Sequence, residues 1–232
     1  MSIYRIADLS VEINPKSEYT KKYISDYLVE DCKPDFSIDV DEEMLNYEKT
    51  LVHGFDEGVY ESTAIFRSLC LKVLECYNGF FFHCSAVSLD GKAYLFTAPS
   101  GTGKSTHAQL WKAHFGDRLK IINDDKPIIR QIENGFVAYG TPWNGKERRG
   151  ENICGKIHGI YIIEQSKTNS VEKLKPASVL STLLCQTVRP KNAKLLNNLL
   201  AMFDGLTNQV PIFRLKCNIS DEAVVTACSV IE

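Results

Sequence analysis

The stretch from Tyr94 to Thr106 has the residue pattern of a phosphate-binding loop. An apolar strand is followed by glycines at positions 101 and 103, by Lys104 and then by an amphipathic helix over 107–115. Glycines let successive backbone N–H groups curl around an anion, and the positive end of the helix faces the same anion. The pattern predicts that a nucleotide is bound by Ser100, Gly101, Thr102, Gly103, Lys104, Ser105 and Thr106.

The same pattern assigns roles to two of these side chains. Lys104 is expected to reach the β- and γ-phosphates of ATP, and the Ser105 hydroxyl to hold the Mg²⁺ ion between them. Ala98 stands where the first glycine is expected, and a small residue is tolerable there. The alternative is a Gly/Ser loop that precedes a lysine by chance, which the flanking strand and helix disfavour.

Paired carboxylates, Asp124 and Asp125, follow the apolar strand 120–123. Together with the loop they allow one carboxylate to contact the metal and the other to accept a proton from an attacking hydroxyl. Neighbours on a strand point to opposite faces, so both roles require the chain to turn here, and Pro127 is compatible with such a break. The alternative is an Asp- and Asn-rich turn that only caps the next element.

His83 lies inside an apolar strand over 80–89, which turns at Asp90-Gly91 into the strand before the glycines. Asp-Gly between two such runs predicts a β-hairpin. A lone histidine in an apolar strand is more often a satisfied core residue. The other reading is that His83 orients a phosphate or a carboxylate in the site.

A polar, glycine-punctuated loop over 140–152 lies between predicted strands at 135–139 and 157–164. Loops at strand ends often grip substrates. Lys146, Arg148 and Arg149 are candidates to neutralise the transferring phosphoryl group or to bind an acidic substrate, and Trp143 to stack on a base or wall off the pocket. The alternative for Lys-Glu-Arg-Arg is a solvated turn.

The order of His83, hairpin, Pro99 to Thr106 and then Asn123-Asp124-Asp125 resembles the HPr kinase/phosphorylase group and its shorter relatives, which share a P-loop core with phosphoenolpyruvate carboxykinases. The resemblance covers about residues 80–165. It implies a catalytic role for His83, with Asp124 as the base and Asp125 towards the metal, although the reverse division of the two carboxylates stays open. Lys104 is a further catalytic candidate on the phosphate-loop pattern alone.

The region around residues 140–152 differs from the HPr kinase group, and this difference suggests which phosphoryl acceptor the protein uses. The Glu-x-Arg-Gly signature of that group does not align here, whereas Gly140-Thr141-Pro142-Trp143 is similar to small HPr-kinase-related proteins, including kinases of serine-type hydroxyls in small molecules or peptides. The resemblance therefore implies such an ATP- and Mg²⁺-dependent kinase. Two alternatives stay open: a protein kinase/phosphorylase acting on a carrier protein, and a nucleotide-binding regulatory module without transfer.

The resemblance implies an α/β fold, with a P-loop core of mixed sheet and flanking helices over 80–232. The residues before this core predict a small α+β subdomain over 1–79. In the subdomain we expect strands at 3–13 and 35–40 and helices at 20–29, 42–51 and 60–77. Beyond residue 165 we expect helices at 176–187 and 192–204, with Gly205 as a C-cap, a strand at 211–218 and a final helix.

Composition narrows the function classes. The net charge of −2 does not favour nucleic acid or an anionic membrane surface as a partner, and no apolar run approaches the length of a membrane span. The eight cysteines are scattered without a C-x-x-C pair, which predicts buried thiols in a cytoplasmic protein rather than disulfides or zinc. The acidic run 39–43 is expected to be a solvated face or a helix N-terminus. A homo-oligomer is one option that the resemblance adds.

Overall fold

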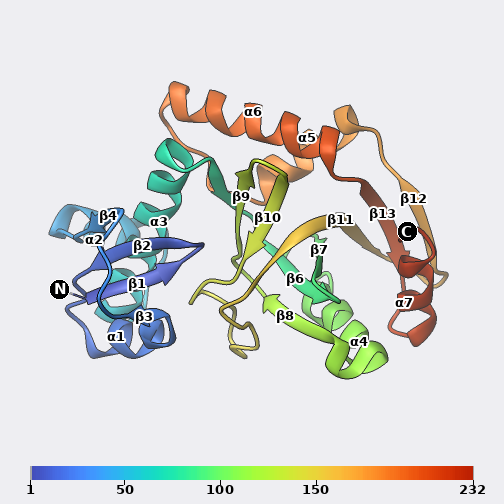
Figure 1. Cartoon of the computed structure of the whole chain (residues 1–232), viewed down its shortest axis with the longest axis horizontal. Coiled ribbons are helices and arrows are strands. Elements are labelled where there is room, and N and C mark those ends of the chain that lie inside the picture. The colour runs from blue at the N-terminus through green and yellow to red at the C-terminus, as the bar shows by residue number, and fades with distance from the viewer. Residues whose placement is uncertain (1, 232) are drawn as a thin grey trace.

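The computed structural model describes residues 2–231, and its strands form two sheets (Figure 1). The strands are β1 (Ser2–Ile6), β2 (Leu9–Ile13), β3 (Leu28–Val29), β4 (Phe36–Ile38), β5 (Gly79–Phe81), β6 (Cys84–Leu89), β7 (Lys92–Thr97), β8 (Leu119–Asn123), β9 (Ile128–Ile132), β10 (Gly135–Tyr139), β11 (Cys154–Gln165), β12 (Ser170–Lys173) and β13 (Ile212–Cys217). The first sheet has the order β3-β1-β2-β4. The second has the order β5-β9-β10-β11-β7-β6-β8, and β13 pairs with both β11 and β12.

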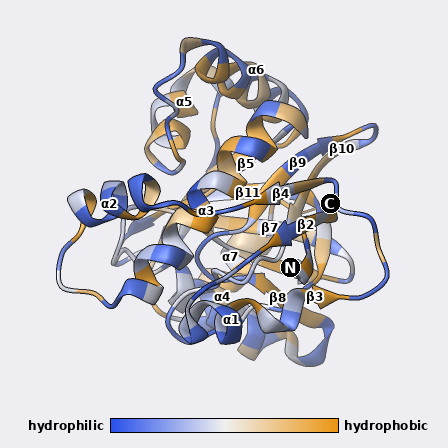
Figure 2. Cartoon of the chain, turned by 90° about the vertical axis from the view of Figure 1, so that its left-hand side faces the viewer, coloured by the Kyte–Doolittle hydropathy of each residue, from blue (hydrophilic) through white to orange (hydrophobic). Residues whose placement is uncertain are grey.

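The helices lie around these sheets, with α5 and α6 along one end and α4 along the opposite end of the view in Figure 1. They are α1 (Glu18–Ile24), α2 (Glu42–Leu51), α3 (Glu57–Cys76), α4 (Lys104–Phe115), α5 (Pro176–Cys185), α6 (Ala193–Gln209) and α7 (Asp221–Cys228), with short 3₁₀ turns at Ser25–Tyr27 and Gly116–Arg118. Figure 2 shows apolar residues concentrated on the central strands. In the part of the chain that is described, no helix combines the length and apolar character needed to span a bilayer.

The long strand β11 holds the large sheet together. Its first residues pair with β10, its middle with β7 and its end with β13. The pairings with β7 and β13 are parallel, whereas the pairing with β10 is antiparallel. The sheet is therefore mixed, which confirms the predicted α/β class with a mixed sheet. Because β7 and β13 flank β11, the loop after β7 and the ends of β11 and β13 lie at one edge.

Two of the predicted strands are each divided in two. The expected strand 3–13 is the hairpin β1–β2, which turns at Ala7 and Asp8 with φ of 52° and 62°. Alanine rarely adopts positive φ, so the sequence carries no ordinary turn signal there. The expected strand 80–89 is broken at Phe82-His83: β5 pairs with β9, whereas β6 pairs with β7 and β8.

Other predictions need smaller corrections. The helix expected at 20–29 ends at Ile24, and Leu28–Val29 form β3 instead. Gly205 lies inside α6 and not at its C-cap. The cysteines are free as expected, but Cys76, Cys154 and Cys185 are exposed rather than buried. The predicted hairpin at Asp90-Gly91 is confirmed by the pairing of β6 with β7.

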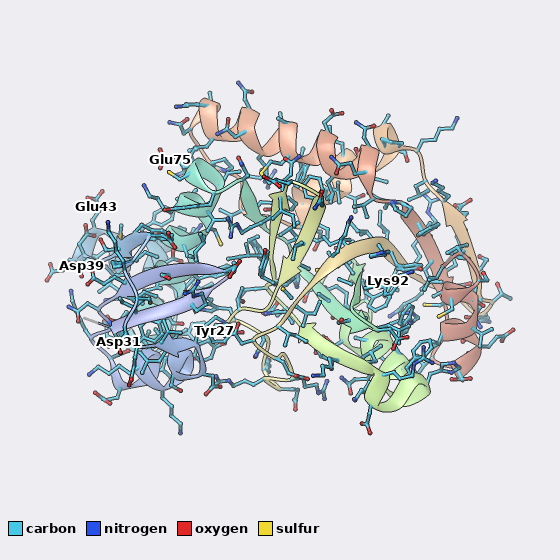
Figure 3. The ribbon with its side chains drawn as sticks, viewed as in Figure 1. Tyr27, Asp31, Asp39, Glu43, Glu75 and Lys92 are labelled. Atoms are coloured by element: carbon cyan, nitrogen blue, oxygen red, sulfur yellow. The ribbon has the colours of Figure 1, made fainter. Side chains whose placement is uncertain are left out.

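The acidic run 39–43 has the surface role that was expected. Asp41 caps α2, since its Oδ1 accepts a hydrogen bond of 2.8 Å from the Met44 backbone N–H. Asp39 and Glu43 project outward, as do Asp31 and Glu75 (Figure 3). The charge in this region is therefore solvated.

The first sheet and α3 share a buried cluster with the second sheet. Ile65 and Leu69 of α3 belong to it, together with Ile128 of β9 and Val137 of β10. The division at residue 79 stays a prediction, and in the structure apolar packing continues across it.

Candidate active site

Most of the predicted site residues line one cavity of about 460 Å³, which we call the carboxylate pocket. Its walls come from the loop after β7, the ends of β5 and β8, and the loop between β10 and β11. The lining residues are His83, Ser100, Gly101, Gly103, Lys104, Ser105, Thr106, Asp124, Asp125, Gly145, Lys146, Glu147 and Arg149. Of the predicted set, Thr102, Trp143 and Arg148 do not line it.

The glycine loop, residues 98–103, joins β7 to α4 in a conformation that requires its glycines. Gly101 has φ of 80° and Gly103 has φ of 113°, values that residues with a side chain rarely adopt. Gly103 is also the N-cap residue of α4. Ala98, in place of the expected first glycine, is fully buried, so a small side chain is accommodated there. The loop thus places the first turn of α4, with its unpaired backbone N–H groups, at the carboxylate pocket.

Lys104 is buried at the first turn of α4 and turns back on the loop. Its Nζ donates to the carbonyl oxygens of Ala98, at 2.9 Å, and Pro99, at 3.4 Å. Burial lowers the pKa of Lys104. Both acceptors are neutral, so an anionic ligand in the pocket would be a stronger partner for the ammonium group.

The turn that directs the two carboxylates into the pocket is made by Asn123. Its buried Oδ1 accepts from the backbone N–H groups of Asp125, at 2.9 Å, and Lys126, at 2.6 Å, while Nδ2 donates to the Thr141 carbonyl at 3.1 Å. The strand therefore ends at Asn123, and the chain turns at the two carboxylates, as their separate roles require. Asparagine is a residue that makes such turns, and this signal was present in the sequence.

Asp124 is the more enclosed carboxylate, with its side chain 6% exposed. Ser85 Oγ donates to its Oδ1 at 2.6 Å, and Arg149 Nη1 lies 3.8 Å from its Oδ2. Burial raises the pKa of Asp124, while hydrogen bonds from Ser85 and Ser105 oppose that rise. Ser85, which sequence reasoning did not single out, thus supports the carboxylate from the middle strand of the β7-β6-β8 group.

Asp125 faces His83. The Nε2 atom of His83 lies 3.3 Å from Asp125 Oδ1, and Lys126 Nζ lies 3.5 Å from Oδ2. Burial, followed by the charge of Lys104, lowers the pKa of His83, so the imidazole is neutral at pH 7. Its backbone N–H donates to the Gln186 carbonyl at 2.7 Å, which fixes the break between β5 and β6.

The loop between β10 and β11 directs some side chains into the carboxylate pocket and others against the N-terminal part of the chain. Lys146 and Arg149 line the carboxylate pocket. Trp143 instead is buried, donates from Nε1 to Ser62 Oγ at 3.0 Å and packs on the Phe66 ring at 4.9 Å. Arg148 donates to the Tyr23 carbonyl at 2.9 Å. The expectation that Trp143 stacks on a base does not fit this position, because its ring is covered by α3.

The residues present fit a magnesium ion at one end of the pocket. Within residues 2–231 there is no group of three or more His, Cys, Asp or Glu arranged to hold a metal. Mg²⁺ does not require one, since it is commonly held by one or two protein oxygens together with water and phosphate. Ser105 and the enclosed Asp124 offer such oxygens, and the raised pKa of Asp124 reflects a buried carboxylate that a cation would stabilise.

Comparisons with known proteins find similarity among solved structures alone, and it is distant. No protein-family model matches the chain, and neither does any curated protein. Among solved structures, the HPr(Ser) kinase/phosphatase from Coxiella burnetii matches with 10% identity and a TM-score of 0.38, over 62% of this chain and 84% of that one. Similarity at this level does not establish a shared activity.

Proposed function

We propose that this protein is an ATP- and Mg²⁺-dependent kinase that transfers the γ-phosphoryl group to a serine-type hydroxyl of a small molecule or peptide. The observation that carries the proposal is the carboxylate pocket, in which a glycine loop and a helix N-terminus face two carboxylates, a neutral histidine and two cationic side chains. Phosphoryl transfer depends mainly on positioning and charge stabilisation, which this set of groups can supply.

In the proposed complex, the glycine loop and Lys104 hold the phosphates of ATP. Ser105 and Asp124 would hold Mg²⁺, which when bound would offset the charge of the β- and γ-phosphates. Lys146 and Arg149, which line the same pocket, stabilise the negative charge on the phosphoryl group as it moves. Arg149 is suited to this because a guanidinium can contact two oxygens at once.

The contacts favour Asp125 as the proton acceptor, the reverse of the division that the sequence suggested. Asp124 is enclosed and hydrogen-bonded by Ser85 and Ser105, whereas the Asp125 side chain is 27% exposed and lies beside His83. In the reaction the acceptor oxygen bonds to the γ-phosphorus, the bond from that phosphorus to the bridging oxygen breaks, and ADP leaves. The hydroxyl proton passes to Asp125, and His83 orients its carboxylate.

The test is ADP release from Mg-ATP with candidate acceptors: free serine, threonine, homoserine and serine-ended peptides. One acceptor should raise the rate of ADP release, and Lys104→Ala should remove that rise.

Asp125→Asn should lower turnover by about 100-fold or more with nucleotide affinity kept, since a general base contributes a rate factor of about 10²–10⁴. Asp124→Asn should weaken Mg-ATP binding. Asp117→Asn, at an exposed position beyond α4, is the matched control and should change neither quantity.

Other outcomes would change the proposal in distinct ways. If Asp125→Asn is active and Asp124→Asn is inactive with unchanged nucleotide affinity, the base is Asp124. ATP loss that no acceptor raises would contradict transfer to a small acceptor. Absence of nucleotide binding to the unmodified protein would reject the kinase altogether.

A further inference from the structure

A second cavity, of about 570 Å³, is also lined by the glycine loop. Gly101, Gly103 and Thr106 line both this cavity and the carboxylate pocket. A ligand that places its phosphates against the loop can therefore extend from one into the other. The remaining walls come from α4 and from the ends of β11 and β13. Because β11 pairs in parallel with both β7 and β13, these strand ends lie beside the loop that follows β7.

The walls of this second cavity are suited to a flat, mostly apolar group. Leu110, Ile163 and Ile219 contribute aliphatic side chains, and Ser166 and Asn218 contribute polar groups. Ile219 is 78% exposed although it is a large aliphatic residue. It follows the end of β13 and lines the cavity, so a ligand bound there would cover its side chain.

His107 supplies the observation that points to a ligand. It lines the cavity and is 2% exposed. The indole N–H of Trp111 donates to its Nε2 at 3.0 Å, and an indole nitrogen can only donate, so Nε2 carries no proton. An imidazole ring whose Nε2 accepts this hydrogen bond carries its proton on Nδ1.

That Nδ1–H group is buried and has no hydrogen-bond partner among the residues that the structure describes. Leaving a buried donor without an acceptor costs about 1–3 kcal/mol, and proteins rarely tolerate it without a reason. A ligand acceptor in the cavity would remove this cost.

We propose that the second cavity is the nucleoside subsite of the nucleotide whose phosphates occupy the glycine loop. The base lies between Leu110, Ile163 and Ile219, and His107 Nδ1–H donates to an acceptor atom of the nucleoside. This inference rests on the proposed function, and it gives the base a place that the buried Trp143 does not provide.

The experiment compares two ligands by titration calorimetry: Mg-ATP, which has a nucleoside, and Mg-tripolyphosphate, which has only the phosphates. The unmodified protein should bind Mg-ATP at least tenfold more tightly. Ile219→Asp should raise the Kd for Mg-ATP about tenfold and leave that for tripolyphosphate unchanged. His107→Phe keeps a ring between Phe96 and Trp111 but removes the donor, and should act in the same direction. Val225→Asp changes another exposed aliphatic residue, which does not line the cavity, and should affect neither ligand.

The outcomes separate this inference from the proposed function. Equal affinity for the two ligands, or an unchanged Mg-ATP affinity in Ile219→Asp and His107→Phe, would overturn the nucleoside subsite and leave the kinase standing. Parallel weakening of both ligands by Ile219→Asp would also overturn it, because the effect would then not be on the nucleoside. Binding of neither ligand to the unmodified protein would reject both.

Discussion

Burial shifts the charge states of the individual side chains around the glycine loop. It raises the pKa of Asp124 and lowers the pKa values of Lys104 and His83, so each shift disfavours the charged form. A phosphate chain and a divalent cation bring the opposite charges to these groups at close range. We therefore expect ligand binding to oppose the pKa shifts of Lys104 and Asp124, and phosphates and metal to bind cooperatively.

His107 allows a prediction for stability that does not depend on catalysis. Its pKa is about 4 in the folded protein and 6.5 ordinarily, so the unfolded chain binds the proton more tightly. The stability contributed by neutral His107 is fully present above pH 6.5 and is lost as the pH falls towards 4. Between pH 7 and pH 5 the loss should be about 2 kcal/mol.

Urea unfolding at both pH values measures this loss. His107→Phe, which has no titrating group, should lose about 2 kcal/mol less than the unmodified protein over the same interval. Comparing the two proteins removes the contributions of other titrating groups. Identical pH dependence in both would mean that the pKa of His107 is the same in the folded and unfolded protein, which its hydrogen bond from Trp111 argues against.

At the scale of elements, the turn after β8 decides where both carboxylates point. Asn123→Ala removes the acceptor of two backbone N–H groups and the donor to the Thr141 carbonyl, all in a buried position. We expect a loss of about 3 kcal/mol in the free energy of unfolding, since unsatisfied buried groups cost about 1–3 kcal/mol each and partial relaxation recovers some of it. Turnover should fall more than the folded fraction does, because Asp124 and Asp125 lose their placement.

Asn192→Ala is the matched control for that variant. Asn192 Oδ1 also accepts from two backbone N–H groups, those of Lys194 and Leu195, but it caps α6 away from the carboxylate pocket. Its replacement should cost about 1 kcal/mol and leave turnover unchanged. Equal effects of the two variants on turnover would show that Asn123 acts through stability alone.

The elements also show what the sequence could predict. Local signals were sufficient for the Asp90-Gly91 hairpin, for α2 and for the start of α4, because each depends on residues adjacent in the chain. The strands β9 and β12 went unrecognised, and the break at Phe82-His83 depends on pairing between β5 and β9, which lie some 50 residues apart. Trp143 was misplaced for the same reason: its burial depends on α3, which no local pattern connects to it.

At the scale of the whole molecule, the N-terminal sheet and the large sheet are joined near the site. Trp143 donates to Ser62 of α3, Arg148 to the Tyr23 carbonyl, and Arg130 Nη1 to the Ala7 carbonyl at 2.8 Å. The loop that carries Arg149 into the carboxylate pocket is therefore anchored on residues 1–79. The shape of that wall depends on the N-terminal part being folded.

The two tryptophans of the chain, Trp111 and Trp143, can test whether the molecule unfolds as one unit. Trp111, in α4, is buried against strands of the large sheet. Trp143, in the loop between β10 and β11, is buried against α3. Trp143→Phe leaves the first as the fluorescent reporter, and Trp111→Phe leaves the second. Because a shared apolar cluster joins the two parts, we expect the fluorescence transition in urea to coincide with the far-ultraviolet circular dichroism transition in each variant.

Loss of Trp143 fluorescence at lower urea than the dichroism change, with Trp111 following the dichroism, would instead mean that residues 1–79 detach first. Turnover measured across the same urea range would then fall with the Trp143 signal, since the wall formed by Arg149 depends on that contact.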